Sequence, residues 1–185
     1  AWKDDTLIGK EVQYVGQIVA AVAAETEEIA QEAATKVKVE YKPLPHQVND
    51  RDPALSKDKP ATRNSGNVEE ALAKADVRME GEYGIPVITH CCLEPHGHVA
   101  EIRGDELHIW PSTQAVSSYA DVSITDASSI PRNKTRVDCQ YMGGGFGAKF
   151  NPGKWGVIST VLAKQSGRPV KLMLDRDLEL MIAGN

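Results

Sequence analysis

The sequence predicts a mixed α+β fold in which short helices and strands alternate, and three observations predict it. Hydrophobic residues make up 41% of the 185 residues and charged residues 25%, close to the averages of soluble globular proteins. Apolar residues recur at helical spacing in some segments and alternate with polar residues in others. Glycine and proline close many of these segments, so the expected elements are short.

The N-terminal part of the chain predicts a β–α–β unit over residues 11–42. Residues 12–24 are rich in β-branched and small apolar residues, which favours a strand pair or one long strand. Thr26 is the expected N-cap of a helix, because acidic residues follow it in the first turn. Residues 37–41 then alternate as a second strand, and prolines close it.

The middle of the chain predicts a break followed by smaller elements. Residues 46–66 are polar and proline-rich, which is typical of a linker or of a surface loop inside one domain. Residues 68–74 predict a short helix, and residues 77–85 alternate as a strand. Residues 99–102 and 107–110 predict two strands of a hairpin, joined by a tight Gly-Asp turn.

The C-terminal part predicts two helices and two strands. Residues 114–128 are expected to be helical, and residues 137–141 alternate as a strand. A second helix is expected over residues 157–165, where Gly167 stops it. Residues 169–174 predict the last strand.

Charge and composition disfavour several classes of protein. The formal net charge is −5 and no Lys/Arg cluster occurs, so nucleic acid is not an expected partner. No apolar run approaches the roughly 18 residues of a transmembrane helix, so no membrane span is expected, and the first residues are not a signal peptide. Three cysteines, two of them adjacent, make a poor disulfide framework. A cytoplasmic location is therefore expected, with the periplasm left open.

The strongest chemical signal is the glycine-rich segment from Met142 to Lys149. Four of its residues are glycines, which allow positive φ and close approach of a ligand to the main chain. Successive N–H groups in such a loop bind anions, and a following helix adds its positive dipole. Gly143, Gly145 and Ala148 also fit the Rossmann pattern G-x-G-x-x-A. A Rossmann-like nucleotide-binding module is therefore one alternative, although the preceding strand is too polar for a central parallel strand.

Two further segments contain residues that could carry chemistry. Residues 89–98 (THCCLEPHGH) hold three His, two Cys and a Glu, which are metal-ligand types, but their spacing matches no zinc motif. A turn with satisfied polar side chains is the simpler interpretation. In the segment WPSTQ, Gln114 follows the end of an expected strand, where ligands often bind. A surface Gln after a helix cap is the competing interpretation.

In order and spacing, these three segments resemble the large, molybdenum-cofactor-binding subunit of the xanthine dehydrogenase and aldehyde oxidase family. The resemblance rests on THCCLEPHGHVAEI (89–102), LHIWPSTQAV (107–116), CQYMGGGFGAKF (139–150) and the tail 167–185, with residues 9–45 similar to the second half of an α/β hammerhead domain. It implies that residues 1–46 are the C-terminal part of a hammerhead domain. Residues 47–66 would be a linker, and residues 67–185 the N-terminal part of a molybdopterin-binding α+β domain.

The resemblance implies that the chain is a fragment of an oxidoreductase, here termed the parent protein. Family members hydroxylate an aldehyde or N-heteroaromatic carbon with oxygen from water, using molybdenum held by molybdopterin. Expected partners are the remainder of the large subunit, an iron–sulfur subunit or domain with [2Fe–2S] clusters, and a small-molecule substrate; a FAD subunit is left open. The fragment alone is expected to be inactive. Apolar surface exposed on a fragment also leaves a homo-oligomer open.

The resemblance also implies roles for individual residues. Gln114 matches the Gln that hydrogen-bonds an oxygen ligand of molybdenum without binding the metal itself. The loop that approaches the cofactor would comprise Gly144, Gly145, Phe146 and Gly147. Phe146 and Phe150 are expected in the substrate pocket, and an apolar Phe150 replaces a Glu that binds purine in xanthine dehydrogenases, which disfavours xanthine. The catalytic Glu is expected downstream, so no catalytic residue is expected in this chain. A non-catalytic folding or interaction unit is the other alternative.

Overall fold

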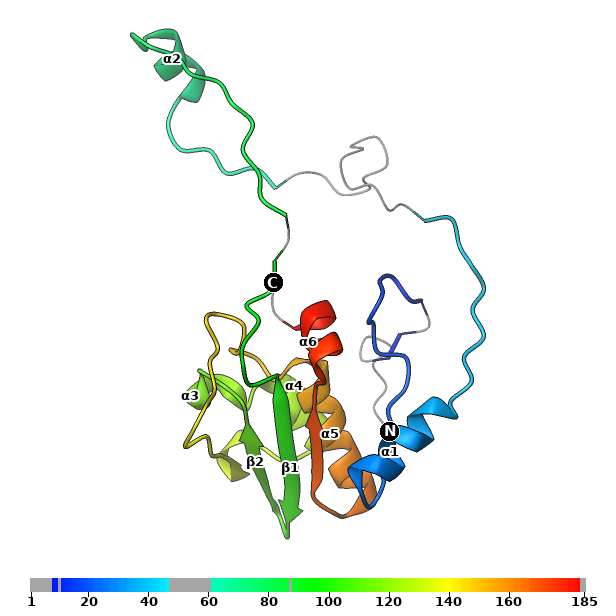
Figure 1. Ribbon diagram of the computed structural model, residues 1–185. Helices are drawn as coiled ribbons and strands as arrows, with labels where there is room; N and C mark the ends of the chain where they lie inside the picture. The colour runs from blue at the N-terminus through cyan, green and yellow to red at the C-terminus, as the bar shows by residue number, and fades with distance from the viewer. Residues whose placement is uncertain (1–7, 10, 47–60, 87, 184–185) are drawn as a thin grey trace. The chain divides into compact units, whose positions relative to one another are not determined.

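The computed structural model describes residues 8–9, 11–46, 61–86 and 88–183 (Figure 1). The chain divides into two compact units. Residues 1–38 and 87–185 contribute to the first, and residues 39–86 form the second. None of the helices in the described part of the chain is long and apolar enough to cross a membrane.

A four-stranded sheet with the order β3-β2-β1-β4 forms the centre of the first unit. Strands β1 (Gly97–Arg103) and β2 (Glu106–Pro111) form the predicted hairpin. Strand β4 (Val170–Met173) pairs antiparallel with β1, and β3 (Thr135–Val137) pairs parallel with β2. The hairpin is longer than predicted because pairing continues past the alternating residues to both ends.

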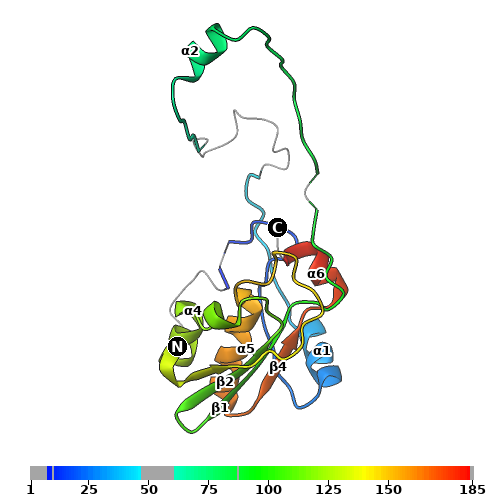
Figure 2. The same ribbon diagram turned by 90° about the vertical axis from the view of Figure 1, so that its left-hand side faces the viewer.

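Helix α5 (Gly153–Ser166) lies along one face of this sheet (Figure 2). The short helices α3 (Val116–Tyr119) and α4 (Val122–Ser128) precede β3, and α4 contacts α5. Helix α6 (Arg176–Ile182) follows β4, and α1 (Glu27–Thr35) belongs to the same unit. A 3-10 turn covers residues 132–134. The main core packs between the sheet and α4 and α5, and its buried members are Ala100, Leu107, Ile109, Tyr119, Ile124, Ala127, Val157 and Ala163.

Several predicted elements differ from the structure. The described residues within 12–24, 37–41 and 77–85 contain no strand, so the predicted β–α–β unit over residues 11–42 is wrong in its strands. Its helix is confirmed, since the Thr26 side chain accepts from the N–H of Ile29 at the start of α1. β-propensity alone does not make a strand, because each strand needs a partner for its main-chain groups.

Two other corrections concern the region around the glycine-rich loop. The single helix predicted over residues 114–128 is two helices, because the Asp121 side chain caps α4 by accepting from the N–H groups of its first turn. The strand predicted over residues 137–141 ends at Val137. In the second unit, the helix predicted over residues 68–74 is confirmed as α2 (Val68–Ala73).

The topology argues against a Rossmann unit. In that unit the strands before and after the loop and helix are parallel neighbours. Here β3 and β4 lie at opposite edges of the sheet, and β4 runs antiparallel to its neighbour β1. In a nucleotide site, Asp175 would be the acidic residue at the end of the second strand. Here it instead caps α6 by accepting from the N–H of Leu178. The glycine pattern therefore occurs outside the context that a dinucleotide site requires.

His98 is a fully buried histidine at the contact between β1 and α5. Its Nδ1 lies 3.1 Å from the Tyr119 hydroxyl, and its Nε2 lies 3.5 Å from Thr160 Oγ1. The Thr160 hydroxyl donates to the Gly156 carbonyl, so its oxygen is placed to accept from Nε2–H, while Tyr119 donates to Nδ1. Burial lowers the pKa of His98 to about 3, and burial raises the pKa of Tyr119. The ring is therefore neutral in the fold.

The buried His98 should make the fold less stable on mild acidification. Below pH 6.5 the His98 ring binds a proton in the unfolded state, whereas in the folded state it stays neutral down to about pH 3. The free energy of unfolding therefore falls as the pH drops through this window. The slope is about 1.4 kcal/mol per pH unit. Urea unfolding measures the free energy of unfolding at pH 7 and at pH 5. The decrease between the two pH values should be about 2 kcal/mol smaller in His98→Gln than in the wild type. An equal loss in both proteins would contradict this assignment.

Candidate functional site

The glycine-rich loop follows β3 and leads to α5, and its main chain takes up conformations that few residues adopt. The φ angles are +101° at Gly144, +51° at Phe146 and +104° at Gly147. Glycine occupies such angles without strain, whereas a bulky residue such as Phe146 rarely does. The surroundings must therefore hold the loop in this shape.

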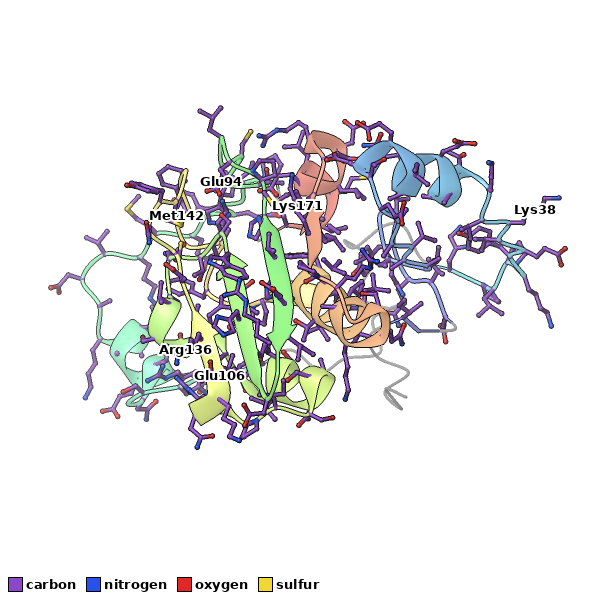
Figure 3. All side chains as sticks on the ribbon, turned by 90° about the horizontal axis from the view of Figure 1, so that it is seen from below. Lys38, Glu94, Glu106, Arg136, Met142 and Lys171 are labelled. Carbon is purple, nitrogen blue, oxygen red and sulfur yellow. The ribbon has the colours of Figure 1, made fainter. Side chains whose placement is uncertain are left out.

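Glu94 holds the beginning of this loop. Its carboxylate accepts from the N–H of Gly143, and its own N–H donates to the Gly143 carbonyl over 3.3 Å. Figure 3 shows Glu94 close to Met142, the residue before the glycines. Lys149, at the end of the loop, is fully buried and donates from Nζ to the Glu94 carbonyl over 2.7 Å; its Nζ also lies 3.6 Å from Glu94 Oε2. One acidic residue thus ties both ends of the loop together.

Cys92 and His96 contact the loop from the same short segment as Glu94, residues 92–96, which bends at Leu93 and Glu94. The Cys92 thiol donates to the Gly145 carbonyl over 3.6 Å. His96 Nε2 lies 3.1 Å from the Ala148 carbonyl, and its Nδ1 lies 2.9 Å from Glu179 Oε1. Residues 92, 94 and 96 of this one segment therefore all reach the loop.

Gln114 holds the second half of the loop. Its Oε1 accepts from the N–H groups of Gly147 (3.0 Å) and Lys149 (3.3 Å). The Lys149 carbonyl in turn accepts from the Gln114 N–H and the Thr113 hydroxyl. A Cβ on Gly145 would overlap Gln114 Oε1, so the carboxamide occupies the space that only glycine leaves open. The structure therefore brings Gln114 into contact with the loop, as their shared site requires.

Three consecutive N–H groups at the tip of the loop have no acceptor in the part of the chain that the structure describes. Within the described residues, the amides of Gly144, Gly145 and Phe146 donate to no other group, whereas Ala148 donates back to Gly145. Gln114 uses Oε1 for the loop, and its Nε2 likewise donates to no described atom. Successive amides in such a turn form a concave donor surface that suits an anion. The tip of the loop and Gln114 together thus present uncharged N–H donors.

The aromatic residues of this region lie at the surface. Phe146 is 75% exposed, and its ring folds back beside Gly144. Phe150 is 49% exposed. Neither residue lines a hollow of about 410 Å³ on the nearby surface, whose wall includes Glu94, Trp110 and Ser112. The structure therefore leaves their placement in a substrate pocket as a prediction.

Sequence reasoning missed several residues that shape this site. Ser112 lines the hollow with a buried hydroxyl that has no hydrogen-bond partner within the described residues. Lys149 and Glu179 are buried charged residues, and neither was singled out. The metal-ligand types in residues 89–98 are not arranged as a metal site: among described residues, no group of three His, Cys, Asp or Glu could hold an ion. Hydrogen bonds to the loop account for Glu94 and His96 instead.

Comparison with known families assigns most of the chain. Residues 51–185 match the family described as molybdopterin cofactor-binding domain. Residues 1–45 match the family described as aldehyde oxidase and xanthine dehydrogenase, a/b hammerhead domain. The two matches follow one another along the chain and leave only a short stretch between them.

Individual relatives agree with these families. The chain is 37% identical over 181 residues to a xanthine dehydrogenase of Drosophila pseudoobscura pseudoobscura, and 32% identical over 195 residues to aldehyde oxidase 2 of Macaca fascicularis. These alignments cover 94% and 98% of this chain but only 13% and 14% of the two relatives. The chain therefore spans a small part of the length of the proteins it resembles.

Solved structures show the same similarity in three dimensions. The chain is similar to the aldehyde oxidoreductase of Desulfovibrio gigas, with a TM-score of 0.71 and 26% identity over 87% of this chain and 19% of that one. It is also similar to quinoline 2-oxidoreductase of Pseudomonas putida 86, with a TM-score of 0.67 and 26% identity over 84% of this chain and 21% of that one.

Proposed function

The chain belongs to the xanthine dehydrogenase and aldehyde oxidase family of molybdopterin-binding proteins, and we propose that its parent protein is a molybdenum-dependent hydroxylase. In this proposal the glycine-rich loop and Gln114 contact the cofactor. The observation that carries it is the set of three adjacent amides, at residues 144–146, that have no acceptor among the described residues. They lie in the loop that Gln114 holds in place.

The residues present fit such a group. Molybdopterin carries phosphate, and the metal that it binds carries oxygen, so the cofactor offers acceptors and negative charge. Main-chain amides stabilise an anion without a positive side chain and without reorganising when it binds. Gly145 leaves its Cβ position open for Gln114, and Gly144 and Gly147 take up positive φ. A loop with side chains at these positions would not keep this shape, so its N–H groups would point elsewhere.

Gln114 performs two tasks in this proposal. Its Oε1 fixes the loop by accepting from Gly147 and Lys149. The Nε2 protons would then donate to an oxygen of the bound cofactor, and Gln114 itself would not bind the metal. A neutral carboxamide can do both at once because it carries an acceptor and a donor on one rigid plane.

The bound cofactor would supply the redox chemistry that inserts oxygen from water into a substrate carbon. This chain would hold and orient it, while the base that removes a proton is expected outside residues 1–185. We propose that residues 1–46, 47–66 and 67–185 are the end of the hammerhead domain, a linker and the start of the cofactor domain. The order of the two matched families supports the order of these parts, and the second match begins at residue 51, within the proposed linker. The proposed partners are the rest of the large subunit and an iron–sulfur subunit or domain with [2Fe–2S] clusters, with FAD on a further subunit or domain.

The three free cysteines support a reducing compartment, and the cytoplasm is the proposed location.

The proposed substrate is an aldehyde or an N-heteroaromatic compound other than xanthine. Phe150 lies in the segment just after the loop and cannot accept a hydrogen bond from a purine. Phe146, which is exposed at the loop tip, would form an apolar wall for a planar ring.

Turnover of a substrate panel tests this specificity. The parent protein should oxidise an aromatic aldehyde with a kcat/KM about a hundredfold above that for xanthine, because an unpaired polar edge of the purine costs about 3 kcal/mol. Phe150→Glu should raise the xanthine value and lower the aldehyde value, and Phe150→Leu is the apolar control. Efficient xanthine oxidation by the wild type would contradict the proposal.

Cofactor analysis tests the proposed function itself. The purified parent protein should contain molybdenum and pterin in equal amounts and hydroxylate a substrate with oxygen derived from labelled water. A protein that contains neither, and that instead binds NAD specifically, would favour the nucleotide-binding alternative. That alternative already conflicts with the arrangement of β3 and β4.

A further inference from the structure

We propose that helix α6 positions the glycine-rich loop by way of the segment 92–96, with Glu179 and Arg176 as the positioning residues. Neither residue reaches the glycines of the loop directly. Both bind the segment that does, since Cys92, Glu94 and His96 contact the loop at its middle, beginning and end. The inference concerns the shape of the loop and holds for the chain with or without a cofactor.

Glu179 fixes His96 from two directions. The carboxylate is 2% exposed, and its Oε2 accepts from the main-chain N–H of His96 over 2.7 Å. The His96 ring lies between Glu179 Oε1 at Nδ1 and the Ala148 carbonyl at Nε2. The ring of Trp155 packs edge-on against it, with the centroids 5.0 Å apart. The imidazole therefore has a fixed orientation, with one nitrogen aimed at the loop.

The contacts of His96 with Ala148 and Glu179 need a hydrogen at each ring nitrogen. A carbonyl oxygen can only accept, so Nε2 must carry a hydrogen to bind Ala148. The contact between Nδ1 and Glu179 then needs a second hydrogen, which sits either on the ring or on the carboxyl group. Glutamine at position 179 could make the same contacts with a neutral ring. Its NH₂ group would donate to Nδ1, and its oxygen would accept from the His96 N–H.

Arg176 fixes the other end of the same segment. Its Nη1 donates to the Cys92 carbonyl and its Nη2 to the Leu93 carbonyl, both over 2.8 Å. Two parallel bonds from one planar guanidinium hold two successive carbonyls in a defined orientation. Cys92 and Glu94, the neighbours of Leu93 in the chain, are the residues that bind the loop.

Helix α6 is itself anchored, so it can serve as a fixed support. Asp175 caps its first turn through the N–H of Leu178, over 2.7 Å. The N–H of Leu174 donates to the His96 carbonyl over 2.9 Å, which joins the end of β4 to the segment. Leu174, which precedes the N-cap of α6, and Ala183, its C-cap, are buried in one cluster with Trp155 of α5.

Hydrogen exchange in the full-length protein tests the proposal. The amides of residues 143 and 147–149 are bonded to protein acceptors, so their exchange reports whether the loop keeps its shape. Glu179→Ala should speed their exchange by about tenfold or more, because His96 loses its support. Glu179→Gln should stay within about twofold of the wild type. Arg176→Ala should speed the same amides, and Arg176→Lys should do so less.

Two control variants separate positioning from general destabilisation. Arg168→Ala removes an exposed arginine just before β4 and should leave the loop unchanged. Ile124→Ala creates a cavity in the main core and should loosen α4 and α5 rather than the loop. Loop exchange that is unchanged in both Glu179→Ala and Arg176→Ala would overturn the proposal. The proposal would also be overturned if Glu179→Gln exchanged as fast as Glu179→Ala, or if the amides of α5 exchanged faster to the same extent as those of the loop. The measured amides bond to protein atoms and not to the cofactor. If the proposed function were wrong, the parent protein would lack pterin, but the differences in amide exchange between the variants would remain.

Discussion

Replacing Gly145 with alanine should strip the parent protein of most of its molybdopterin while the sheet and α5 remain folded. The added Cβ would overlap Gln114 Oε1, so the carboxamide must move away. Its two bonds to the amides of Gly147 and Lys149 are then lost. At about 1 kcal/mol for each bond, the cofactor should bind about thirtyfold more weakly. Molybdenum content by mass spectrometry and pterin fluorescence after oxidation would measure the loss.

Gly84 offers a matched control for this experiment. A Cβ at Gly84 would meet nothing within 4 Å, and the residue does not have positive φ. Gly84→Ala should therefore retain the wild-type content of molybdenum. If Gly145→Ala also kept the full content, the loop would not be the cofactor contact that we propose.

The second large effect is expected at Gln114, where two substitutions separate its two tasks. Gln114→Glu keeps an oxygen that can accept from Gly147 and Lys149, but it removes the NH₂ donor and adds a negative charge. Turnover per bound molybdenum should fall about a hundredfold, the usual cost of one lost donor at a reacting oxygen. Gln114→Ala should lose this donor and the shape of the loop together.

Amide exchange distinguishes these two variants. In Gln114→Glu the amides of Gly147 and Lys149 should remain protected, whereas in Gln114→Ala they should exchange faster. If Gln114→Glu turned over at the wild-type rate per molybdenum, the carboxamide would serve only to shape the loop. The proposed contact with the cofactor would then be wrong.

The sequence predicted those elements whose signals are local. The hairpin of β1 and β2 follows from alternating residues around a Gly-Asp turn, and α5 ends at the predicted Gly167. Helix α6 was not predicted, because its seven residues are too few to show a periodic pattern. Asp121 was a readable cap signal for α4, yet the run of helix-compatible residues around it suggested one continuous helix.

The candidate site shows the same division between local and long-range information. Local sequence patterns singled out the glycine-rich loop and the segment around Glu94, and the family resemblance gave Gln114 its expected role. It could not show that Glu94 binds Gly143, 49 residues away, or that His96 binds Glu179, 83 residues away. Lys149 resembled any surface lysine, and only the fold places it with its amine on the Glu94 carbonyl. Such pairs depend on tertiary packing, which no local pattern encodes.

The structure of the parent protein with its cofactor bound would test the central claim most directly. The N–H groups of Gly144, Gly145 and Phe146 and the carboxamide of Gln114 should then lie within hydrogen-bonding distance of the molybdopterin or of the oxygen ligands of its metal. A cofactor bound by other segments, with these amides donating to another part of the protein, would contradict it.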